Sequence, residues 1–385
     1  MAIQVREHRP GVDLKEFLEV PRLLYAGDPG FVVPLDMEQR DKLTPSKNPF
    51  FQHADVSLFT AYADGRLAGR ISAQIDREHL ARYGDLCGFF GHFDCVDDER
   101  VARALVDAAV SWLKLRGMVV MRGPFSLSIN EEIGTMVEGQ TEPSMLMTPY
   151  HRGCQDRLAK AAGLSPLKDL LSWHYRIGEI PARAQRAHTE VLAMPEVRIR
   201  SASLKNLEHD VRVLMDVYND AWSDNFHFVP MTEAELGKMA QDMKLLLDEQ
   251  IALIAEIDGE PAAIAVALPN LNEAIFDLNG KLLPFGLAKL IYRLKVSRPK
   301  SARLILLGIK QAYRKKRRYG GLSTALYVEI ARRATRMGYE WAELGWTDEA
   351  NQPVNLGIRM MGGVVHKRHR LYERPLGQET AAGSG

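Results

Sequence analysis

Several features that are common in other protein classes are scarce or missing from this chain of 385 residues. Its three cysteines do not have the spacing of a metal site, so we expect no bound metal, and so few thiols indicate a reducing compartment. No stretch reaches roughly 18 apolar residues without a charge, so we expect no transmembrane helix. The first residues, MAIQVREHRPGVDL, lack the apolar core of a signal peptide. Together these absences predict a cytoplasmic protein.

An excess of charge of one sign is also missing. The chain carries 50 Lys and Arg against 49 Asp and Glu, a formal net charge of +1. A dedicated nucleic-acid-binding protein usually has a large basic excess, so we expect no nucleic-acid partner. What the sequence does contain, 46% apolar and 26% charged residues, is typical of a globular protein, and its length predicts about two domains.

One pattern of strands and helices occurs twice along the chain. Residues 58–71 (LFTAYADGRLAGRI) and 252–265 (ALIAEIDGEPAAIA) each read as an apolar strand, an Asp-Gly pair and a second strand. An Asp-Gly pair between apolar segments is a strong signal for a tight β-hairpin. A further strand, a long amphipathic helix closed by glycine and another strand follow each hairpin, and the helices cover about 99–116 and 322–337. This alternation predicts an α/β fold built from two similar units.

The boundary between the units is predicted where the character of the sequence changes. Near residues 180–195, an Ile-Pro pair leads into a charged, helix-like stretch. We therefore expect a first unit at 1–180 and a second at 181–376. The last residues, 377–385, are small and polar and are predicted to form a flexible tail.

The sharpest local feature is a glycine-containing turn between an apolar strand at 304–309 and the second long helix. The turn reads RRYGGLST at 317–324 and contains the order Arg-x-x-Gly-x-Ser. A helix N-terminus carries unpaired N–H groups and a partial positive charge, and glycine lets an anion approach the backbone closely. The turn therefore predicts a phosphate site. It lacks the Gly-Lys-Ser/Thr ending of a nucleotide-hydrolysing loop, which argues against that chemistry.

A strand, this turn and a helix in succession resemble the acyl-CoA pocket of the GCN5-related N-acetyltransferase (GNAT) superfamily. The resemblance covers most of 197–375 and implies an α/β fold of two tandem GNAT-like units, with mixed sheets flanked by helices and the acyl-CoA turn in the second unit. It also implies that the strand before the turn pairs with the pantetheine arm and that the turn holds the CoA pyrophosphate. The cofactor-binding residues that it implies are Leu307, Ile309, Arg318, Gly320, Gly321, Leu322, Ser323 and Asn355.

Two positions depart from the pattern of the superfamily. Ser323 stands where the family has glycine or alanine, and it keeps that position small. The tyrosine that usually protonates the leaving thiolate falls at Ile358 in this sequence. Tyr372, in the last strand, is the candidate substitute, and a packing role in the core is the alternative for it.

The first unit has the same order of elements but no phosphate turn. The corresponding segment, DCVDDER at 94–100, is acidic and would repel a pyrophosphate. We therefore expect the first unit to be a degenerate GNAT-like unit that shapes the acceptor pocket and does not bind CoA.

Further short motifs narrow the resemblance to a group of bacterial double-GNAT proteins that includes the bacterial ceramide synthases. They are FVVP (31–34), GFF (88–90), RGP (122–124), NEEIG (130–134) and NGKLLP (279–284). The resemblance implies an enzyme of sphingolipid biosynthesis that needs no cofactor and uses acyl-CoA as a co-substrate. It would transfer a fatty acyl group directly to the amine of a long-chain base such as sphinganine or 3-ketosphinganine.

Amide formation needs a base that takes a proton from the attacking amine. Glu131 and Glu132 lie in the polar sequence SINEEIG at 128–134 and are the candidate bases, with turn formation as the alternative role. His366 and His369, near Tyr372 in the sequence, are further candidates.

Residues 282–300, LLPFGLAKLIYRLKVSRPK, combine apolar side chains with five Lys or Arg and no acid. A basic amphipathic helix of this kind can lie in a membrane interface with its cations toward anionic headgroups. The segment predicts peripheral contact with the inner face of the cytoplasmic membrane. A surface helix that packs on the core is the alternative.

The residues leave two other functions open. Peptidoglycan-type aminoacyl transferases also have paired GNAT units, and that function would depend on charged transfer RNA. The missing tyrosine at Ile358 suggests a non-catalytic, membrane-associated acyl-CoA sensor, which would bind its ligand without turnover.

Overall fold

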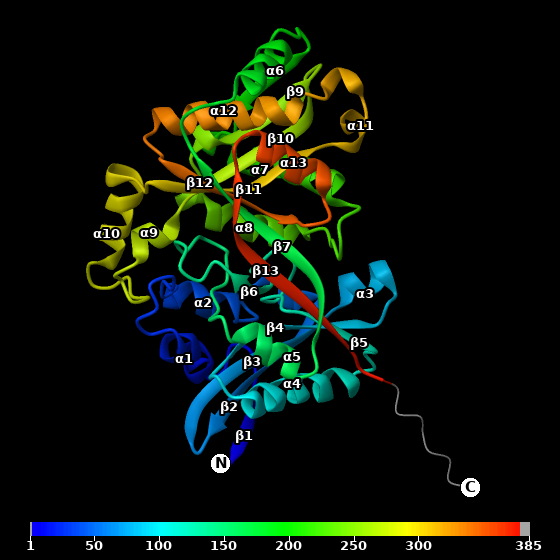
Figure 1. Cartoon of the computed structure of the whole chain (residues 1–385), viewed down its shortest axis with the longest axis vertical. Coiled ribbons are helices and arrows are strands. Elements are labelled where there is room, and N and C mark those ends of the chain that lie inside the picture. Colours follow the sequence, from blue (N-terminus) through cyan, green and yellow to red (C-terminus); the bar gives the residue numbers. More distant parts are fainter. Residues whose placement is uncertain (1, 378–385) are drawn as a thin grey trace. The chain divides into compact units, whose positions relative to one another are not determined.

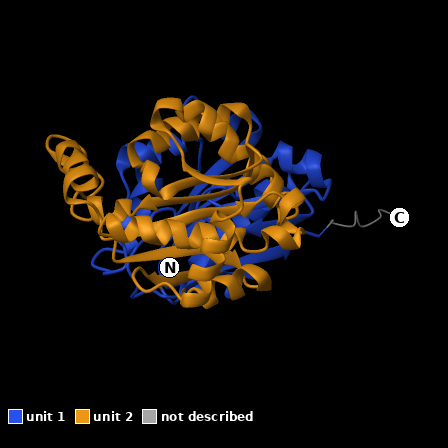
Figure 2. Cartoon of the chain, turned by 90° about the horizontal axis from the view of Figure 1, so that it is seen from above, with its two compact units in different colours: residues 1–170, 367–385 blue, residues 171–366 orange. Residues whose placement is uncertain are grey.

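The computed structural model describes residues 2–377, so the predicted tail, apart from Gly377, lies outside the described residues. The chain divides into two compact units, coloured separately in Figure 2. Unit 1 comprises the residues up to Leu170 and those from Lys367 onward, and unit 2 comprises Leu171–His366. The predicted division at 180 lies near the first of these boundaries. The prediction placed the C-terminal strand in the second unit, whereas most of this strand belongs to unit 1.

The elements of unit 1 alternate between strands and helices (Figure 1). In chain order they are β1 (Ile3–His8), α1 (Lys15–Leu24), α2 (Asp36–Lys42), η1 (Pro49–Gln52), β2 (Ala54–Ala63), β3 (Arg66–Asp76), α3 (Arg77–Tyr83), β4 (Cys87–Cys95), α4 (Glu99–Lys114), β5 (Val120–Gly123), β6 (Thr135–Glu138), α5 (Gln155–Ala161) and the start of β7 (Ser165–Arg176). The final strand, β13 (Val364–Pro375), also contributes most of its residues to this unit.

Unit 2 has the same succession. Its elements are the end of β7, then α6 (Ala182–Leu192), β8 (Val197–Ser201), η2 (Leu204–Asn206), α7 (Leu207–Trp222), α8 (Glu233–Leu246), η3 (Glu249–Ile251), β9 (Ala252–Ile257), β10 (Glu260–Pro269), α9 (Leu271–Ile275), α10 (Gly286–Tyr292), η4 (Arg293–Ser297), β11 (Ser301–Ile309), α11 (Gln311–Arg314), η5 (Arg317–Tyr319), α12 (Leu322–Arg336), β12 (Trp341–Asp348), α13 (Gln352–Met360) and the start of β13.

The strands of the two units have matching topology within one 13-stranded sheet. In unit 1 the strand order is β1-β2-β3-β4-β5, and in unit 2 it is β8-β9-β10-β11-β12. Neighbouring strands are antiparallel except for the last pair of each series, which is parallel and is joined by a long helix, α4 or α12. Both predicted hairpins are confirmed. Asp64 and Asp258 have φ angles of 48° and 54° and are followed by glycines at 77° and 83°, the left-handed pair that a tight two-residue turn requires.

Each unit receives its last strand from the other half of the sequence. β13, at the C-terminal end of the chain, pairs with β5 in unit 1, where Tyr372 is opposite Gly123. β7 leaves unit 1 after Leu170, and its later residues stand next to β12 in the sheet order. The repeated order of elements is therefore accompanied by an exchange of the terminal strands, which no local sequence pattern predicts.

The core of unit 2 lies between its sheet and two helices, α12 and α6 (Figure 1). Alternate residues of β9, namely Leu253, Ala255 and Ile257, face this core, as expected for a strand whose side chains point to opposite faces in turn. α12 contributes its apolar stripe, including Leu326 and Ala334. Among residues 2–377, none of the helices is both long enough and apolar enough to cross a membrane.

Candidate active site

The parallel strands β11 and β12 of unit 2 pair over only part of their lengths. Their register runs from Ser301 opposite Trp341 to Leu304 opposite Leu344. β11 continues to Ile309, and over that distance it pairs with β10 on its other side. The edge of β11 that would face β12 is therefore open beyond Leu304.

Two predicted residues lie on this open edge. The backbone N–H of Lys310 donates to the carbonyl of Ala262 in β10, at 2.9 Å. Because backbone groups alternate in direction along a strand, the groups of Leu307 and Ile309 point to the opposite side. The Ile309 carbonyl accordingly accepts from Arg314 and not from β10, at 3.1 Å. The open edge thus has backbone donors and acceptors that an extended ligand could pair with, and the binding role of these two residues stays a prediction.

α12, the long helix that follows the turn, begins without a side-chain cap for its first backbone N–H groups. Gly321 is the residue before α12, and no side chain caps the helix there. The first turn of α12 contains no acid, whereas Arg317 and Arg318 precede it. Unpaired N–H groups, the helix dipole and nearby cations all favour an anion at this position.

The two glycines of the turn have different surroundings. Both have negative φ, so neither is needed for a left-handed backbone. A Cβ at Gly321 would lie 3.1 Å from Val191 of α6, so packing accounts for this glycine. A Cβ at Gly320 would approach only the Arg317 carbonyl, at 3.3 Å. No side chain from another element packs against Gly320, so a ligand that approaches the backbone is the better explanation for a glycine there.

The remaining predicted turn residues divide between surface and core. Arg318 is 64% exposed and pairs with Glu196 at 2.5 Å. Ser323 is half-buried in the first turn of α12, and Leu322 is fully buried beneath it. Leu322 is therefore a core residue whose contribution to an anion site is limited to its backbone N–H.

Asn355 has a different environment from the one predicted for a CoA ligand. It is only 2% exposed, and its amide nitrogen donates to the carbonyls of Asp348 and Glu349 at 3.0 and 3.1 Å. Its amide oxygen accepts from Thr347 at 2.7 Å. The side chain thus holds the loop between β12 and α13, because all its polar atoms are engaged there.

Tyr372 lies in unit 1, whereas the turn lies in unit 2. It is fully buried, and its hydroxyl donates to Asp156 at 2.7 Å. Burial, followed by the contact with Asp156, raises the pKa of this phenol. This burial and the bond to Asp156 favour the packing role that was the alternative for Tyr372, and Ile358 is likewise buried.

Glu131 and Glu132 are half-buried in a loop of unit 1 between β5 and β6. The carboxylate of Glu131 lies 3.3 Å from Lys42. Burial raises the pKa of Glu132, and the nearby Lys42 opposes that shift. The amide of Gln74 donates to two carbonyls of the same loop, at 2.6 and 3.2 Å, and so fixes its position.

In unit 1 the position that corresponds to the open edge is closed. The ladder between β4 and β5 ends at Phe89, and the N–H of Phe125 then donates to the Phe90 carbonyl at 2.7 Å. A Cβ on Gly91 would be 1.9 Å from the Phe125 carbonyl, so the chain fills this space with its own backbone. α4 is also capped, because the Asp98 carboxylate accepts from the Arg100 N–H at 2.9 Å.

A polar cluster that the sequence analysis underrated lies in unit 2. Arg303 and Glu343 face each other in the register of β11 and β12, with Nε 3.5 Å from the carboxylate, and both are buried. His366 contacts the same carboxylate at 3.0 Å. By strand alternation these side chains point to the face opposite Leu304 and Leu344. The sequence contained a signal for this cluster, because Arg303 and Glu343 each stand in the middle of an otherwise apolar strand.

Comparison with solved structures identifies the class of fold. The chain superposes on a tandem GNAT protein from the clavulanic acid biosynthesis pathway with a TM-score of 0.60, 11% identity and coverage of 98% of this chain and 100% of that one. A GCN5-related N-acetyltransferase from Sphaerobacter thermophilus gives a TM-score of 0.54, with 13% identity and coverage of 98% and 96%. The protein therefore has the predicted tandem GNAT fold.

Two curated proteins are similar in sequence over nearly their whole lengths. Bacterial ceramide synthase from Caulobacter vibrioides is 41% identical over 94% of this chain and 95% of its own length. Protein YghO from Escherichia coli is 37% identical over 94% and 93%. No family model matches the sequence. The chain belongs to the family of the bacterial ceramide synthase, as the sequence motifs predicted.

Proposed function

We propose that the protein is an acyl-CoA-dependent N-acyltransferase that joins a fatty acyl group to the amine of a long-chain base, as a bacterial ceramide synthase does. One observation carries the proposal: the open edge of β11 is followed, after the short helices α11 and η5, by the uncapped, acid-free start of α12. The extended pantetheine arm of CoA can pair with such an edge while the pyrophosphate of CoA accepts hydrogen bonds from the N–H groups at the start of the helix. The family relationship adds the class of acceptor.

In the proposed reaction the amine nitrogen attacks the thioester carbon. A C–N bond forms, the C–S bond breaks, the amine proton passes to a base and the thiolate leaves as CoA after taking up a proton. Backbone N–H groups on the open edge of β11 can stabilise the oxyanion of the tetrahedral intermediate. No covalent enzyme intermediate is needed, because positioning of the two substrates supplies much of the rate.

The base is proposed from two groups of residues. Glu132, with Glu131 beside it, has a pKa raised by burial, and a raised pKa brings a carboxylate closer to the working range of a general base. The His366–Glu343 pair in unit 2 is the second candidate, since an imidazole held by a carboxylate is a common arrangement for proton transfer. Variants of Glu132 and His366 distinguish the two.

We also propose that residues 282–300 contact anionic membranes. Leu283 and Phe285 are 81% and 80% exposed, and Val296 is 66% exposed, which is unusual for large apolar side chains on one short segment. Asp277 pairs with Lys289 and Arg293, so the apolar side chains carry more of the argument than those two cations do. The exposed apolar side chains and the Lys and Arg residues of this segment together suit the interface of a bilayer.

Sedimentation with vesicles tests the membrane proposal. We expect binding to phosphatidylglycerol-containing vesicles that weakens when Leu283 and Phe285 are both changed to serine. Binding that is unaffected by the double change, or absent from the wild type, would contradict it. Leu115, which is 85% exposed on unit 1, offers a matched control through Leu115→Ser.

A turnover assay tests the reaction itself. The protein is given palmitoyl-CoA with sphinganine or 3-ketosphinganine, and thiol release and amide product are followed together, the latter by mass spectrometry. We expect amide and free CoA in equal amounts. Binding of palmitoyl-CoA without product would favour the sensor, and activity that requires charged transfer RNA would favour an aminoacyl transferase. Neither alternative is favoured by the family relationship.

A further inference from the structure

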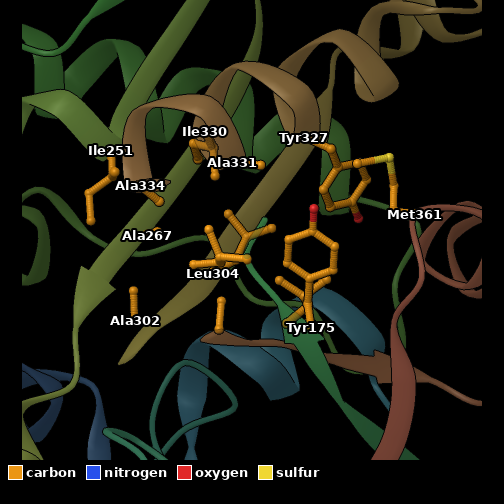
Figure 3. A pocket seen from close by; sticks show the side chains of 13 residues that line it. Tyr175, Ile251, Ala267, Ala302, Leu304, Tyr327, Ile330, Ala331, Ala334 and Met361 are labelled. Atoms are coloured by element: carbon orange, nitrogen blue, oxygen red, sulfur yellow. The ribbon is translucent and has the colours of Figure 1, made fainter. Parts of the chain in front are cut away.

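Two spaces in the molecule differ greatly in size. The apolar space beneath α12 in unit 2, whose lining Figure 3 shows, has a volume of about 20 Å³, room for about one water molecule. A pocket in unit 1 has a volume of about 580 Å³, which lies in the usual range for small-molecule sites. It is lined by residues at the start of α1, in α2 and just after α2: Gly11, Asp13, Leu14, Lys15, Asp36, Met37, Arg40, Asp41, Thr44 and Lys47.

Charged side chains dominate the lining of this pocket, and some of them already have partners. The carboxylate of Asp41 lies 2.6 Å from the ammonium of Lys47. Asp36 pairs with Arg22 of α1, which stands outside the lining. These two ion pairs leave three charged side chains of the lining to be explained.

The remaining three are Asp13, Lys15 and Arg40. Within the part of the chain that the structure describes, their side chains take part in no hydrogen bond or ion pair, and all three residues are exposed. The pocket therefore presents one free carboxylate and two free cations. This combination suits a zwitterion, because the cations can bind an anionic group such as phosphate while the carboxylate accepts hydrogen bonds from an ammonium.

Exposed apolar side chains lie beside these charges. Met37 lines the pocket and is 60% exposed. Val12 stands between two lining residues, Gly11 and Asp13, and is 62% exposed. A soluble zwitterion has no use for such side chains, whereas charged groups next to exposed apolar ones are typical of proteins that lie at a membrane interface. The zwitterion that fits best is therefore the headgroup of a phospholipid.

The lining also distinguishes between zwitterionic headgroups. A primary ammonium donates hydrogen bonds to a carboxylate such as that of Asp13. A quaternary ammonium has no hydrogen to donate, and proteins recognise it with aromatic side chains. None of the described residues that line the pocket is aromatic. Phosphoethanolamine therefore suits this pocket, and phosphocholine does not.

We propose that this pocket of unit 1 binds the phosphoethanolamine headgroup of a membrane phospholipid. Lys15 and Arg40 contact its phosphate, and Asp13 contacts its ammonium. The site uses other residues than the segment 282–300, for which contact with anionic lipid is proposed above. The inference is also independent of the proposed reaction, so its failure would leave acyl transfer untouched.

Sedimentation of the full-length protein with two kinds of vesicle tests the inference. Both kinds contain the same fraction of phosphatidylglycerol, and the remainder is phosphatidylethanolamine in one and phosphatidylcholine in the other. We expect the wild type to bind the ethanolamine vesicles about tenfold more tightly, the effect of roughly one charge-assisted hydrogen bond. Equal binding to both kinds, or binding to neither, would overturn the inference.

Two variants of the pocket locate the preference. Asp13→Asn removes the carboxylate but keeps a residue that tolerates the left-handed backbone, since φ is 51° at this position. We expect its preference for ethanolamine vesicles to fall to about one, and Arg40→Gln to weaken binding to these vesicles severalfold. Arg103→Gln is the matched control, because Arg103 is an exposed cation of α4 outside the pocket, and it should keep the preference. A preference that survives in Asp13→Asn would contradict the proposal.

Two further measurements separate this pocket from other sources of the same behaviour. Changing Leu283 and Phe285 to serine should weaken binding to both kinds of vesicle and keep the preference. A preference that is lost there and kept in Asp13→Asn would assign it to residues 282–300 and overturn the inference. Free phosphoethanolamine, measured by calorimetry, should bind only weakly, since it lacks the apolar contacts. Tight binding of the free headgroup, with equal binding to both kinds of vesicle, would indicate a soluble ligand and overturn the assignment to a lipid.

Discussion

The two units share one order of strands and helices but treat the same position in opposite ways. In unit 1 the chain closes the space between its parallel strands with the backbone of Phe125, and Asp98 caps the following helix. In unit 2 the edge of β11 stays open and α12 begins at Gly321 without a cap. Unit 1 thus satisfies its own backbone groups at this position, whereas unit 2 does not. In the proposed function, the groups left open in unit 2 are those that acyl-CoA would contact.

The largest expected effect comes from blocking the open turn. Gly320→Leu places a side chain where an approaching phosphate would lie, and its Cβ would meet one atom of the fold within 4 Å, the Arg317 carbonyl oxygen at 3.3 Å. We expect acyl-CoA affinity to fall by roughly 1000-fold, because about two charge-assisted hydrogen bonds of ~2 kcal/mol each are lost. Calorimetry measures the affinity. Gly237→Leu, in α8 at a position where a Cβ would meet no atom within 4 Å, should bind normally. Equal acyl-CoA affinity in the two variants would show that the turn is not part of the acyl-CoA site.

The next effect tests whether unit 1 takes part in the chemistry. Glu132→Gln is expected to lower kcat by roughly 100-fold if this carboxylate is the base. Burial raises the folded-state pKa of Glu132, so its stabilising contribution is present at low pH and is lost as pH rises through that pKa. The neutral glutamine should therefore also raise Tm at neutral pH. pH–rate profiles and thermal melts measure both changes.

His366→Gln is the matched variant from unit 2. A loss of kcat in this variant, with full activity in Glu132→Gln, would assign proton transfer to the His366–Glu343 pair. Glu131→Gln removes the partner of Lys42 and serves as the control for a purely electrostatic disturbance of the loop.

A smaller effect should follow from giving unit 2 the chemistry of unit 1. Ser323→Asp introduces an acid into the first turn of α12, as Glu99 does in α4. We expect about a tenfold loss of acyl-CoA affinity through charge repulsion, with a slight gain in Tm, because an acid favours a helix N-terminus. Ser323→Asn, which adds no charge, should bind nearly as well as the wild type. A parallel loss in both variants would point to steric effects instead.

The smallest expected effect concerns Tyr372. Tyr372→Phe removes the hydrogen bond to Asp156 in the core of unit 1, and we expect a loss of about 1 kcal/mol in unfolding free energy. Denaturant unfolding measures this loss. Thiol release should continue at the wild-type rate, and a drop in kcat of roughly 100-fold would restore Tyr372 as an acid for the leaving thiolate.

Local patterns predicted much of this structure. The Asp-Gly pairs fixed the hairpins, because two successive left-handed residues suit few other conformations. The RRYGGLST turn was correctly placed before a helix, because glycines after an apolar strand mark its end and the amphipathic pattern of the helix begins directly after them. The unit of Tyr372 depends on a partner far away in the sequence, Asp156. The loop-holding role of Asn355 depends on how the short loop between β12 and α13 turns back on it, which no sequence pattern shows.

The exchange of terminal strands limits how this protein can be divided. A fragment that ended near residue 180 would lack β13, so β5 would present an unpaired edge, and a fragment that began there would lack β7 beside β12. Bare strand edges of this kind promote aggregation. Neither half is therefore expected to be an autonomous folding module, in spite of the repeated architecture. Functional complementation would require both halves to be synthesised together.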